Sequence, residues 1–266
     1  MNTDTVQRRQ SLVAQTAAMS KRAVLAVVRQ PSIVFPSMLF PLFFVALGTS
    51  SFSRAIDIPG FPEVDSFLDF ALAGAIVQGI LFGSTVSATA LATDIENGFF
   101  DRLLATPSSR TSILVGRLAG GMAFGGFQTL VFVLLLLPFG LDVKSGPLGI
   151  LIMIVGGILV ALAVGGLMAA MAIKTGSSEA VQGSFPLLFI LLFFSSTFFP
   201  RETMTGFHQA IADVNPVSYL AEGFRSLTID SLNAGAVGEA LLIPLGLSVA
   251  TLALSLRTLR NRLAAS

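Results

Sequence analysis

Residues 148–173 read LGILIMIVGGILVALAVGGLMAAMAI, a run without a single charged side chain. An α-helix rises about 1.5 Å per residue, so roughly 20 apolar residues cross the ~30 Å hydrocarbon core of a bilayer. A run of this length and composition therefore predicts a transmembrane helix. Further runs of this kind in the chain predict further spans.

The composition of the whole chain agrees with a membrane protein. Of its 266 residues, 53% are hydrophobic and 12% are charged, whereas a soluble domain has roughly 25% charged residues. The mean hydropathy is +0.83. These values exclude an ordinary soluble enzyme and a disordered polar chain. The net charge of +1 gives no indication of a nucleic-acid partner.

Few residues are available for thiol or metal chemistry. The chain has no Cys and a single His, His208. Thiol catalysis, iron-sulfur ligation and Cys-based zinc sites are therefore excluded, and His208 is expected to be an exposed or interfacial polar residue. No catalytic, cofactor-binding or metal-binding residue is predicted in this chain.

Six segments are predicted to span the membrane, which gives an all-α polytopic membrane protein. They are residues 33–52, 67–92, 113–138, 148–173, 181–199 and 237–256. The last is the weakest, because it contains Glu239 and Pro244. The expected division is an N-terminal cytoplasmic amphipathic helix at 1–30, a six-span transmembrane domain at 31–257 and a cytoplasmic tail at 258–266.

The distribution of Lys and Arg predicts the orientation, since short basic loops stay on the cytoplasmic side. With the N-terminus inside, the following twelve of the 16 basic residues are cytoplasmic: Arg8, Arg9, Lys21, Arg22, Arg29, Arg102, Arg110, Arg117, Lys174, Arg257, Arg260 and Arg262. An even number of spans also places the C-terminus inside. Residues 1–15 lack an apolar h-region, so a cleaved signal peptide is not expected.

Basic and apolar residues alternate between residues 6 and 30, before Pro31. This pattern predicts a basic amphipathic helix lying in the inner headgroup plane. A cytoplasmic helix packed on another subunit is the alternative.

Residues 94–110 read DIENGFFDRLLATPSSR and are too charged to span. Ile95, Phe99 and Leu103 recur every four residues, which predicts one apolar stripe on a short helix. Pro107 lacks an N–H and is expected to end that helix. Such a helix either connects two spans or forms a docking surface.

Two further regions carry polar residues with a possible role. After the fifth span, Pro200 and Asn215-Pro216 are expected to separate two short amphipathic helices, which lie in the outer interface or dip into the membrane. In the second span, Gln78, Thr85 and Thr89 share one helical face. Polar residues at this depth face protein or a water-filled path, so they line either a translocation path or a helix interface.

Taken together, these motifs resemble the membrane-spanning permease subunits of ABC-2 type exporters, the group that contains the daunorubicin-resistance permeases. Glu96-Asn97-Gly98 followed by residues 102–110 is similar to the family's acidic, Gly, then Leu-x-x-Thr-Pro pattern. Phe198-Phe199-Pro200 with Asn215-Pro216, Tyr219 and Arg225 resembles its outer helical region. The chain departs from the family at residues 204–206, where a Pro is common, and at Asn97, where a second acidic residue is common.

The resemblance implies an exporter of two permeases and two separate ATP-binding subunits. The second permease is an identical copy or a paralogue, and ATP and Mg are held by the ATPase. The loop then implies a coupling helix made of Asp94, Ile95, Glu96, Gly98, Phe99, Phe100, Asp101, Arg102, Leu103, Thr106 and Pro107. The outer region implies a gate or a cap made of Phe199, Pro200, Asn215, Pro216, Tyr219 and Arg225. A bacterial cytoplasmic membrane is the implied location.

The chain itself contains no G-x-x-x-x-G-K-[ST] phosphate loop, so ATP hydrolysis is expected in a partner. A pathway rich in Phe, Leu, Ala and Gly suits a hydrophobic or amphipathic cargo, such as a lipid or a lipophilic drug. A polysaccharide or lipid-linked glycan is the alternative, although the chain has no Trp and one Tyr for stacking on sugars. A passive channel is a further alternative. It would need a continuous polar face in several spans, whereas only the second span has one. An intramembrane enzyme would need a catalytic pair that the spans lack.

Overall fold

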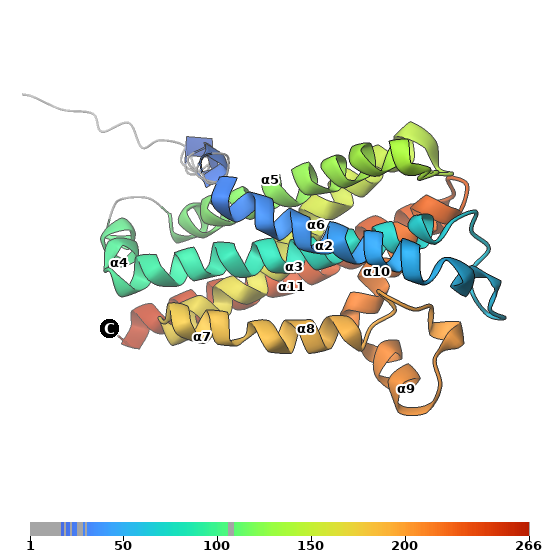
Figure 1. Cartoon of the computed structure of the whole chain (residues 1–266). Coiled ribbons are helices and arrows are strands. Elements are labelled where there is room, and N and C mark those ends of the chain that lie inside the picture. Colours follow the sequence, from blue (N-terminus) through green and yellow to red (C-terminus); the bar gives the residue numbers. More distant parts are fainter. Residues whose placement is uncertain are drawn as a thin grey trace, which may run out of the picture.

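The computed structural model describes residues 17–18, 20–21, 23–25, 29, 31–105 and 109–265, without the side chains of 31–34 and 265. Within these ranges the secondary structure is helical (Figure 1), which confirms the all-α prediction. Most of the expected amphipathic helix at 1–30 lies outside the described residues. The same is true of Thr106 and Pro107.

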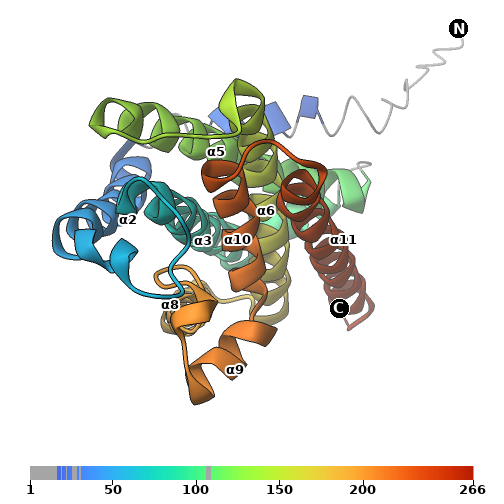
Figure 2. The same cartoon turned by 90° about the vertical axis from the view of Figure 1, so that its right-hand side faces the viewer.

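Four long helices form the body of the molecule, and they have the length and composition needed to cross a membrane. They are α3 (Phe67–Glu96), α5 (Arg110–Leu136), α6 (Gly146–Thr175) and α11 (Ala234–Ala265). Helix α6 packs against the other three, and Figure 2 shows the group from its end. The predicted second, third, fourth and sixth spans are therefore confirmed as helices. The expected tail boundary at 258 falls inside α11, which continues to Ala265.

Small residues let these helices approach closely. A Cβ atom added to Gly125 of α5 would lie 2.7 Å from the carbonyl oxygen of Gly157 on α6. One added to Gly166 of α6 would lie 2.7 Å from the hydroxyl oxygen of Thr251 on α11. Backbone contact of this kind holds helices together in lipid, where there is no hydrophobic driving force between apolar surfaces.

Helix α2 (Pro31–Ser51) corresponds to the predicted first span and packs on α3. Its described apolar part, Phe35–Ser51, is one of two shorter apolar helical stretches. The other is Ser178–Phe193, at the predicted fifth span. A 3₁₀ turn, η1 (Ser53–Asp57), follows α2, and a second, η2 (Leu137–Phe139), follows α5.

The predicted fifth span at 181–199 is a shorter, interrupted helical stretch. The chain forms α7 (Ser178–Gly183), then α8 (Phe185–Phe193), and leaves helical geometry before Pro200. Pro186 lies in the first turn of α8 and has no N–H to donate back into α7, so the helix is interrupted there. The hydroxyl of Ser184 instead donates to the Val181 carbonyl at 2.6 Å.

The outer segment contains the two short helices that Pro200 and Asn215-Pro216 predict. After η3 (Arg201–Thr203) come α9 (Gly206–Val214) and α10 (Pro216–Ile229). Helix α10 turns back into the bundle and packs against α3 and α11 (Figures 1 and 2). Its placement in the outer interface or deeper in the membrane stays a prediction.

Candidate functional site

The segment predicted to couple to an ATPase begins in the last turn of α3, and Gly98 separates this helix from the next. Gly98 has φ +66°, a left-handed conformation that residues with a Cβ adopt at a cost. Helix α4 (Phe99–Leu104) starts immediately after it. The single helix expected to carry Ile95, Phe99 and Leu103 is therefore wrong, because Ile95 belongs to α3 and the other two to α4.

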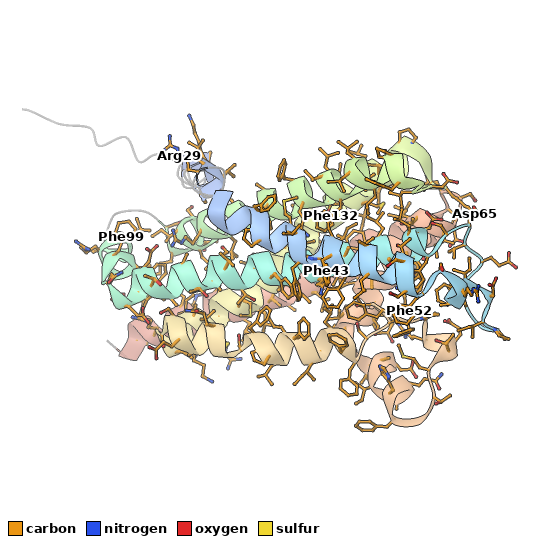
Figure 3. The ribbon with its side chains drawn as sticks, in the orientation of Figure 1. Arg29, Phe43, Phe52, Asp65, Phe99 and Phe132 are labelled. Atoms are coloured by element: carbon orange, nitrogen blue, oxygen red, sulfur yellow. The ribbon has the colours of Figure 1, made fainter. Side chains whose placement is uncertain are left out.

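The apolar residues of this segment face two ways. Ile95 is 5% exposed and Phe100 is 2% exposed, and both belong to the hydrophobic core. Leu103 packs against the same core. Phe99 is half-buried at the tip of α4, at the end of the bundle in Figure 3. Among the expected apolar anchors, Phe99 is thus the one best placed to meet another protein.

The acidic residues of the segment bind to other helices of the same chain. Glu96 accepts hydrogen bonds from the backbone nitrogen of Ser178 at 2.6 Å and from its hydroxyl at 3.0 Å. Asp94 forms an ion pair with Arg117 of α5. These contacts attach the end of α3 to α5 and to the start of α7.

The segment also contacts the C-terminal helix. Asp101 lies 3.7 Å from Arg262 of α11, and Arg262 donates to the Ile173 carbonyl of α6 at 3.2 Å. The guanidinium of Arg102 donates to the Gly98 carbonyl at 3.3 Å. Residues 94–101 are therefore linked by side-chain contacts to α5, α7 and α11, and through Arg262 to α6.

The three polar residues of the second span do not form one network. The hydroxyls of Thr85 and Thr89 each donate at 3.0 Å to the backbone carbonyl four residues earlier in α3. Gln78 is 1% exposed, and its Nε2 atom has no hydrogen-bond partner among the described residues. Gln78 and Thr85 line two separate cavities.

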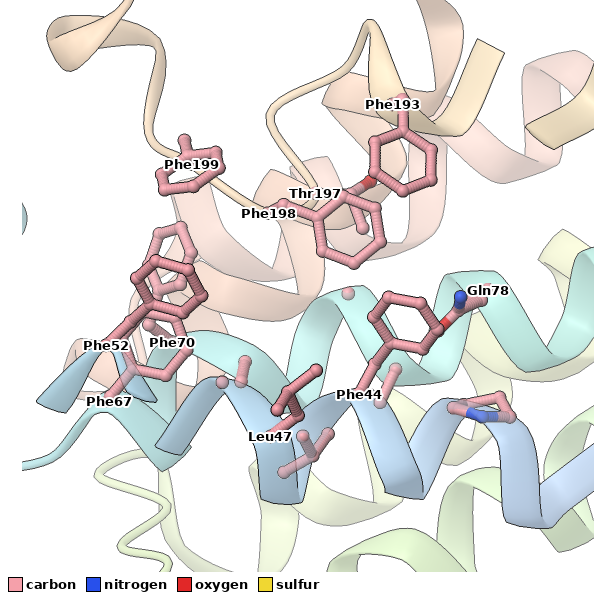
Figure 4. A pocket seen from close by; sticks show the side chains of 16 residues that line it. Phe44, Leu47, Phe52, Phe67, Phe70, Gln78, Phe193, Thr197, Phe198 and Phe199 are labelled. Carbon is pink, nitrogen blue, oxygen red and sulfur yellow. The ribbon is translucent and has the colours of Figure 1, made fainter. Parts of the chain in front are cut away.

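Cavities follow one another between α2, α3 and α8. The inner cavity is lined by Phe40, Phe82 and Thr85, among others. The second, shown in Figure 4, extends from Gln78 to Phe52. The rings of Phe40 and Phe82 lie 5.2 Å apart on the inner side of Gln78.

An outer cavity continues this series and is lined by η1, the residues around η3 and His208. Phe52 and Phe199 line both the second cavity and this outer one. Their ring centroids are 6.1 Å apart in an edge-to-face arrangement. The Phe52–Phe199 pair is therefore the wall that the two cavities share.

Asn215 holds the outer segment to the end of α8. Its side-chain oxygen accepts from Val217 N at 2.9 Å and so caps α10. Its Nδ2 atom donates to the carbonyls of Leu191 at 2.6 Å and Phe194 at 2.8 Å. Pro216 begins α10, where its missing N–H costs nothing.

Arg225 is a buried cation on α10, with 5% of its surface exposed. It donates to the Ser196 carbonyl at 2.6 Å, and its guanidinium lies 3.8 Å from the centre of the Phe70 ring on α3. The hydroxyl oxygen of Ser218 accepts a hydrogen bond from the Ser196 backbone nitrogen at 3.1 Å. These contacts fix residues 194–199 between α3 and α10.

Arg201, a residue that the sequence did not single out, connects several residues of α9 and α10. It binds Glu222 through two hydrogen bonds, lies 3.7 Å from Asp213, and covers the Tyr219 ring at 4.2 Å. Burial lowers the pKa of Arg201, but the hydrogen bonds to Glu222 and Tyr219 outweigh it, and the net shift is upward. Its charge is therefore permanent.

A smaller polar cluster closes the same end of the bundle. Lys144 lies 3.1 Å from Asp65, and this hydrogen bond raises the pKa of Lys144. Asp69 accepts from Ser66 N at 3.1 Å and from Asp142 N at 2.9 Å, which joins the start of α3 to the loop before α6.

Several of these partners have no signal in the sequence. Ser178 lies 82 positions from Glu96, and Arg225 lies 29 positions from Ser196. Neither pair has the short spacing from which a contact can be predicted. Arg201 and Glu222, by contrast, are charged residues within the segment already marked as amphipathic, and their opposite charges are the one signal available.

Comparison with known proteins identifies relatives over most of the chain. The ABC-2 type transporter family matches residues 14–229. The daunorubicin resistance ABC transporter permease protein DrrB1 of Streptomyces coeruleorubidus is 32% identical over 257 residues, which cover 96% of this chain and 89% of the relative. The inner membrane transport permease YadH of Escherichia coli K12 is 25% identical over 199 residues, which cover 73% of this chain and 74% of the relative.

These matches fit a multi-pass, all-helical membrane subunit that relies on a separate ATPase. The family match, the similarity to DrrB1 across nearly the whole chain and the long apolar helices support the same conclusion. The chain is a permease and belongs to the ABC-2 type transporter family.

Proposed function

We propose that this chain is the permease of an ATP-driven exporter that moves a hydrophobic or amphipathic molecule, such as a lipid or a lipophilic drug, out of the cytoplasm or the inner leaflet. The observation that carries this proposal is a series of three cavities, of which two lie between α2, α3 and α8 and the third is lined by η1 and the residues around η3. The walls of the first two are almost entirely apolar, and the Phe52–Phe199 pair separates the second from the third. An apolar molecule would be stable in each of the first two.

The assembly is proposed to contain two copies of a separate ATP-binding subunit, which hold ATP and Mg, and a second permease that is identical or paralogous. The surface for the ATPase is α4 with Glu96, Gly98 and Phe99. Helix α8 supports a contact with the second permease or with lipid, because its exposed side chains are large and apolar: Phe185, Leu187, Ile190 and Phe193. No nucleic acid takes part.

Six membrane crossings are proposed, with both termini in the cytoplasm of a bacterial cell. Helix α2 supplies the first crossing, and α7 together with α8 supplies the fifth. This topology puts the contacts of Glu96, Asp94 and Arg262 at the inner end of the bundle and those of Arg201 and Lys144 at the outer end. The basic residues then follow the positive-inside distribution. Residues 1–30 remain the proposed interfacial helix, 31–257 the transmembrane domain and 258–266 the tail.

Coupling would run from α4 to the cavities through α3 and α7. Closure of the ATPase dimer would push on Phe99 and on the charged face around Arg102. The hydrogen bonds between Glu96 and Ser178 would carry this movement to α7 and hence to α8, one wall of the cavities. Thr106 and Pro107 remain part of the proposed coupling segment.

The outer segment is proposed to act as a gate. Support comes from Phe199, which with Phe52 forms the wall shared by two cavities. Asn215, Pro216, Arg225 and Pro200 would keep this wall in place, and Tyr219 would help to hold Arg201. A rigid cap is the competing role, since buried hydrogen bonds around Asn215 and Arg225 also suit a segment that never moves.

A lipophilic cargo is preferred to a glycan on the basis of one aromatic residue. The single Tyr in the chain is Tyr219, and its ring is already covered by the guanidinium of Arg201. No Trp exists to take its place. Stacking of a sugar on Trp is therefore excluded, and stacking on Tyr is limited to the one ring that Arg201 already contacts.

The decisive experiment is purification of the tagged chain from its native membrane, followed by mass spectrometry of the co-purifying chains and reconstitution. We expect an ATP-binding subunit to co-purify and ATP to drive movement of a lipophilic dye into or out of proteoliposomes. Selective movement of a lipid-linked glycan would overturn the cargo assignment. Repeated recovery of this chain alone, with no ATP-dependent flux, would overturn the exporter assignment and favour a passive channel.

A further inference from the structure

Three side chains of α11 donate hydrogen bonds to backbone carbonyls of α6 at a regular spacing. The pairs are Ser248 with Leu159, Ser255 with Gly166, and Arg262 with Ile173. Donors and acceptors each recur every seven residues, the period at which the same faces of two helices meet again when they cross at a small angle. The two helices therefore run in the same direction and share one register along their length.

Close contact between the two backbones makes this pair a rigid part of the bundle. A Cβ atom added to Gly156 of α6 would lie 3.0 Å from the Ala240 carbonyl oxygen of α11, and Gly166 also approaches α11 closely. Ser248 is 1% exposed and Ser255 is 0% exposed. Close-packed interiors transmit strain rather than absorb it. The α6–α11 pair is therefore a firm base for an element attached to its inner end.

At this inner end, Arg262 takes the place that serine has in the other two contacts. Its acceptor, the Ile173 carbonyl, belongs to the last turn of α6, where carbonyl groups have no partner within their own helix. A positive charge at this end of a helix is also favourable. The Arg262 side chain is 30% exposed, so it reaches from the interface of α6 and α11 toward the surface of the bundle.

The guanidinium of Arg262 has a second partner on α4. Its Nη1 atom donates to the Ile173 carbonyl, and its Nη2 atom lies 3.7 Å from the Oδ2 atom of Asp101. A planar guanidinium holds two partners on two nitrogens, whereas a lysine has one nitrogen for both. Figure 1 shows α4, α7 and the C-terminal end of α11 at one end of the bundle. Arg262 thus connects α4 to the α6–α11 pair.

The same guanidinium lies beside the turn that leads from α6 to α7. A Cβ atom added to Gly176, which has φ +62°, would lie 3.3 Å from Nη1 of Arg262 and 3.6 Å from Cγ2 of Ile95. Ile95 is in the last turn of α3. Ser178, at the start of α7, binds Glu96 of α3. The ends of α3, α6 and α11 and the start of α7 therefore meet at this turn.

We propose that Arg262 is a positioning residue for ATP-driven transport, an inference that rests on the proposed exporter function. Through Asp101 it sets the orientation of α4 relative to the α6–α11 pair. With α4 held against this base, a movement of the ATPase passes into α3 and α7. Without the contact, part of the movement only tilts α4, so ATP is hydrolysed with less transport.

A weak contact is enough to orient α4. This helix has six residues and follows Gly98, where an added Cβ atom would meet no other atom of the described residues within 4 Å. A short helix on such a joint needs little free energy to select one orientation. The Asp101 side chain is 57% exposed, and exposed ion pairs contribute little to stability. The alternative is that Arg262 only closes the end of α6, and loss of Asp101 would then have no effect on α4.

The first test measures the orientation of α4 directly and needs no ATPase. The chain has no Cys, so spin labels can be attached to Ala105→Cys just after α4 and to Leu167→Cys, about two turns outward from the end of α6. Both positions are exposed. Pulsed EPR of the full chain in nanodiscs gives the distribution of distances between the labels.

Arg262→Gln should broaden this distribution, because it removes the charge that holds α4 and keeps a donor for the α6 carbonyl. Asp101→Asn should broaden it as well, and this variant leaves α11 untouched. Arg260→Gln removes the same charge from an exposed position on α11, so it is the matched control and should leave the distribution unchanged. Thermal unfolding in nanodiscs verifies that each variant is folded.

The second test measures transport per ATP hydrolysed in proteoliposomes that contain the ATPase. Asp101→Asn and Arg262→Gln should each lower this ratio by up to about five-fold, the limit for one exposed ion pair. The double variant should be no worse than either single variant, because both remove the same contact. Arg262→Lys should keep most of the ratio, and Arg260→Gln all of it.

The outcomes separate this inference from the function on which it rests. An unchanged distance distribution in Arg262→Gln and Asp101→Asn would overturn the positioning role, and so would additive losses of transport in the double variant. Absence of ATP-driven transport in the unmodified complex, with a broader distribution in the two variants, would overturn the exporter assignment while supporting the orientation of α4 by Arg262.

Discussion

The carboxylate of Glu96 accepts two hydrogen bonds from Ser178, one from the backbone nitrogen at 2.6 Å and one from the hydroxyl at 3.0 Å. This contact joins the last residue of α3 to the first residue of α7. Because α7 leads directly into α8, the inner end of α3 is connected to a wall of the cavities. Glu96 therefore holds α3 and α7 together within its own chain, and this role is separate from any contact with a partner.

Substitutions at Glu96 separate these two roles. Glu96→Gln removes the charge but keeps an oxygen for the Ser178 nitrogen, whereas Glu96→Ala removes both. If transport depends on the contact between Glu96 and α7, Glu96→Gln should keep most of the transport per ATP hydrolysed and Glu96→Ala should lose it. Association with the ATPase should be unchanged in both variants. The measurement is transport and ATP hydrolysis in the same proteoliposomes.

Ser178→Ala is the matched control, because it removes the hydroxyl and retains the stronger backbone contact. We expect only a small loss of coupling in this variant. An equal loss of transport in Glu96→Gln and Glu96→Ala, together with loss of the ATPase from the complex, would show instead that the ATPase binds the charged carboxylate of Glu96.

Phe99 and Phe100 are neighbours with opposite environments, so the same substitution should have different effects. Phe100 is buried, and Phe100→Ala should cost about 3–5 kcal/mol in the free energy of unfolding. Phe99 is half-buried at the tip of α4, and Phe99→Ala should cost much less but weaken association with the ATPase. Thermal unfolding in detergent and co-purification with the ATPase measure the two effects.

The contrast is informative in either direction. An unchanged complex with Phe99→Ala would remove Phe99 from the coupling surface. A stability loss at Phe99 as large as that at Phe100 would mean that α4 is a purely internal element.

The difference between Phe99 and Phe100 also shows how far the sequence could predict this region. The four-residue spacing of Ile95, Phe99 and Leu103 is real, but it predicts a shared face only if the helix is continuous. Gly98 breaks the helix, so the spacing no longer describes one face. Gly98 is visible in the sequence, but its left-handed backbone conformation depends on the rest of the fold and could not be predicted from it.

The fifth span illustrates a second limit. Hydropathy averages over a window, and the window around residues 181–199 is apolar throughout, so one helix is the natural prediction. The interruption comes from one missing N–H at Pro186 and from hydroxyl groups near Ser195 that bond to the local backbone. The long spans were predictable because each is an apolar run long enough to cross the bilayer. The buried environments of Arg225 and Gln78 were not, because they depend on which helices pack together.

Asn215 offers a test of the outer segment. Its amide donates to two carbonyls at the end of α8 and its oxygen caps α10. Asn215→Ala should cost about 2–4 kcal/mol in the free energy of unfolding, from a lost cap and from unpaired carbonyl groups. Asn215→Asp keeps the cap but turns a carboxylate oxygen toward those carbonyls, so it should be no more stable than Ala. Thermal unfolding of the two variants in detergent measures this difference, and a near-wild-type Asp variant would mean that the cap alone matters.

The Phe52–Phe199 pair tests whether the outer segment moves. The chain has no Cys, so the double variant Phe52→Cys, Phe199→Cys can be joined by a short bifunctional thiol reagent without side reactions at other residues. If the pair is a gate, cross-linking should stop transport while ATP hydrolysis continues, and cleavage of a reducible linker should restore transport. The single variants treated with the same reagent are the controls, because they carry the modification without the bridge. Full transport through the cross-linked protein would identify the segment as a fixed cap, since the wall between the two cavities would then be closed and yet not in the way of the cargo.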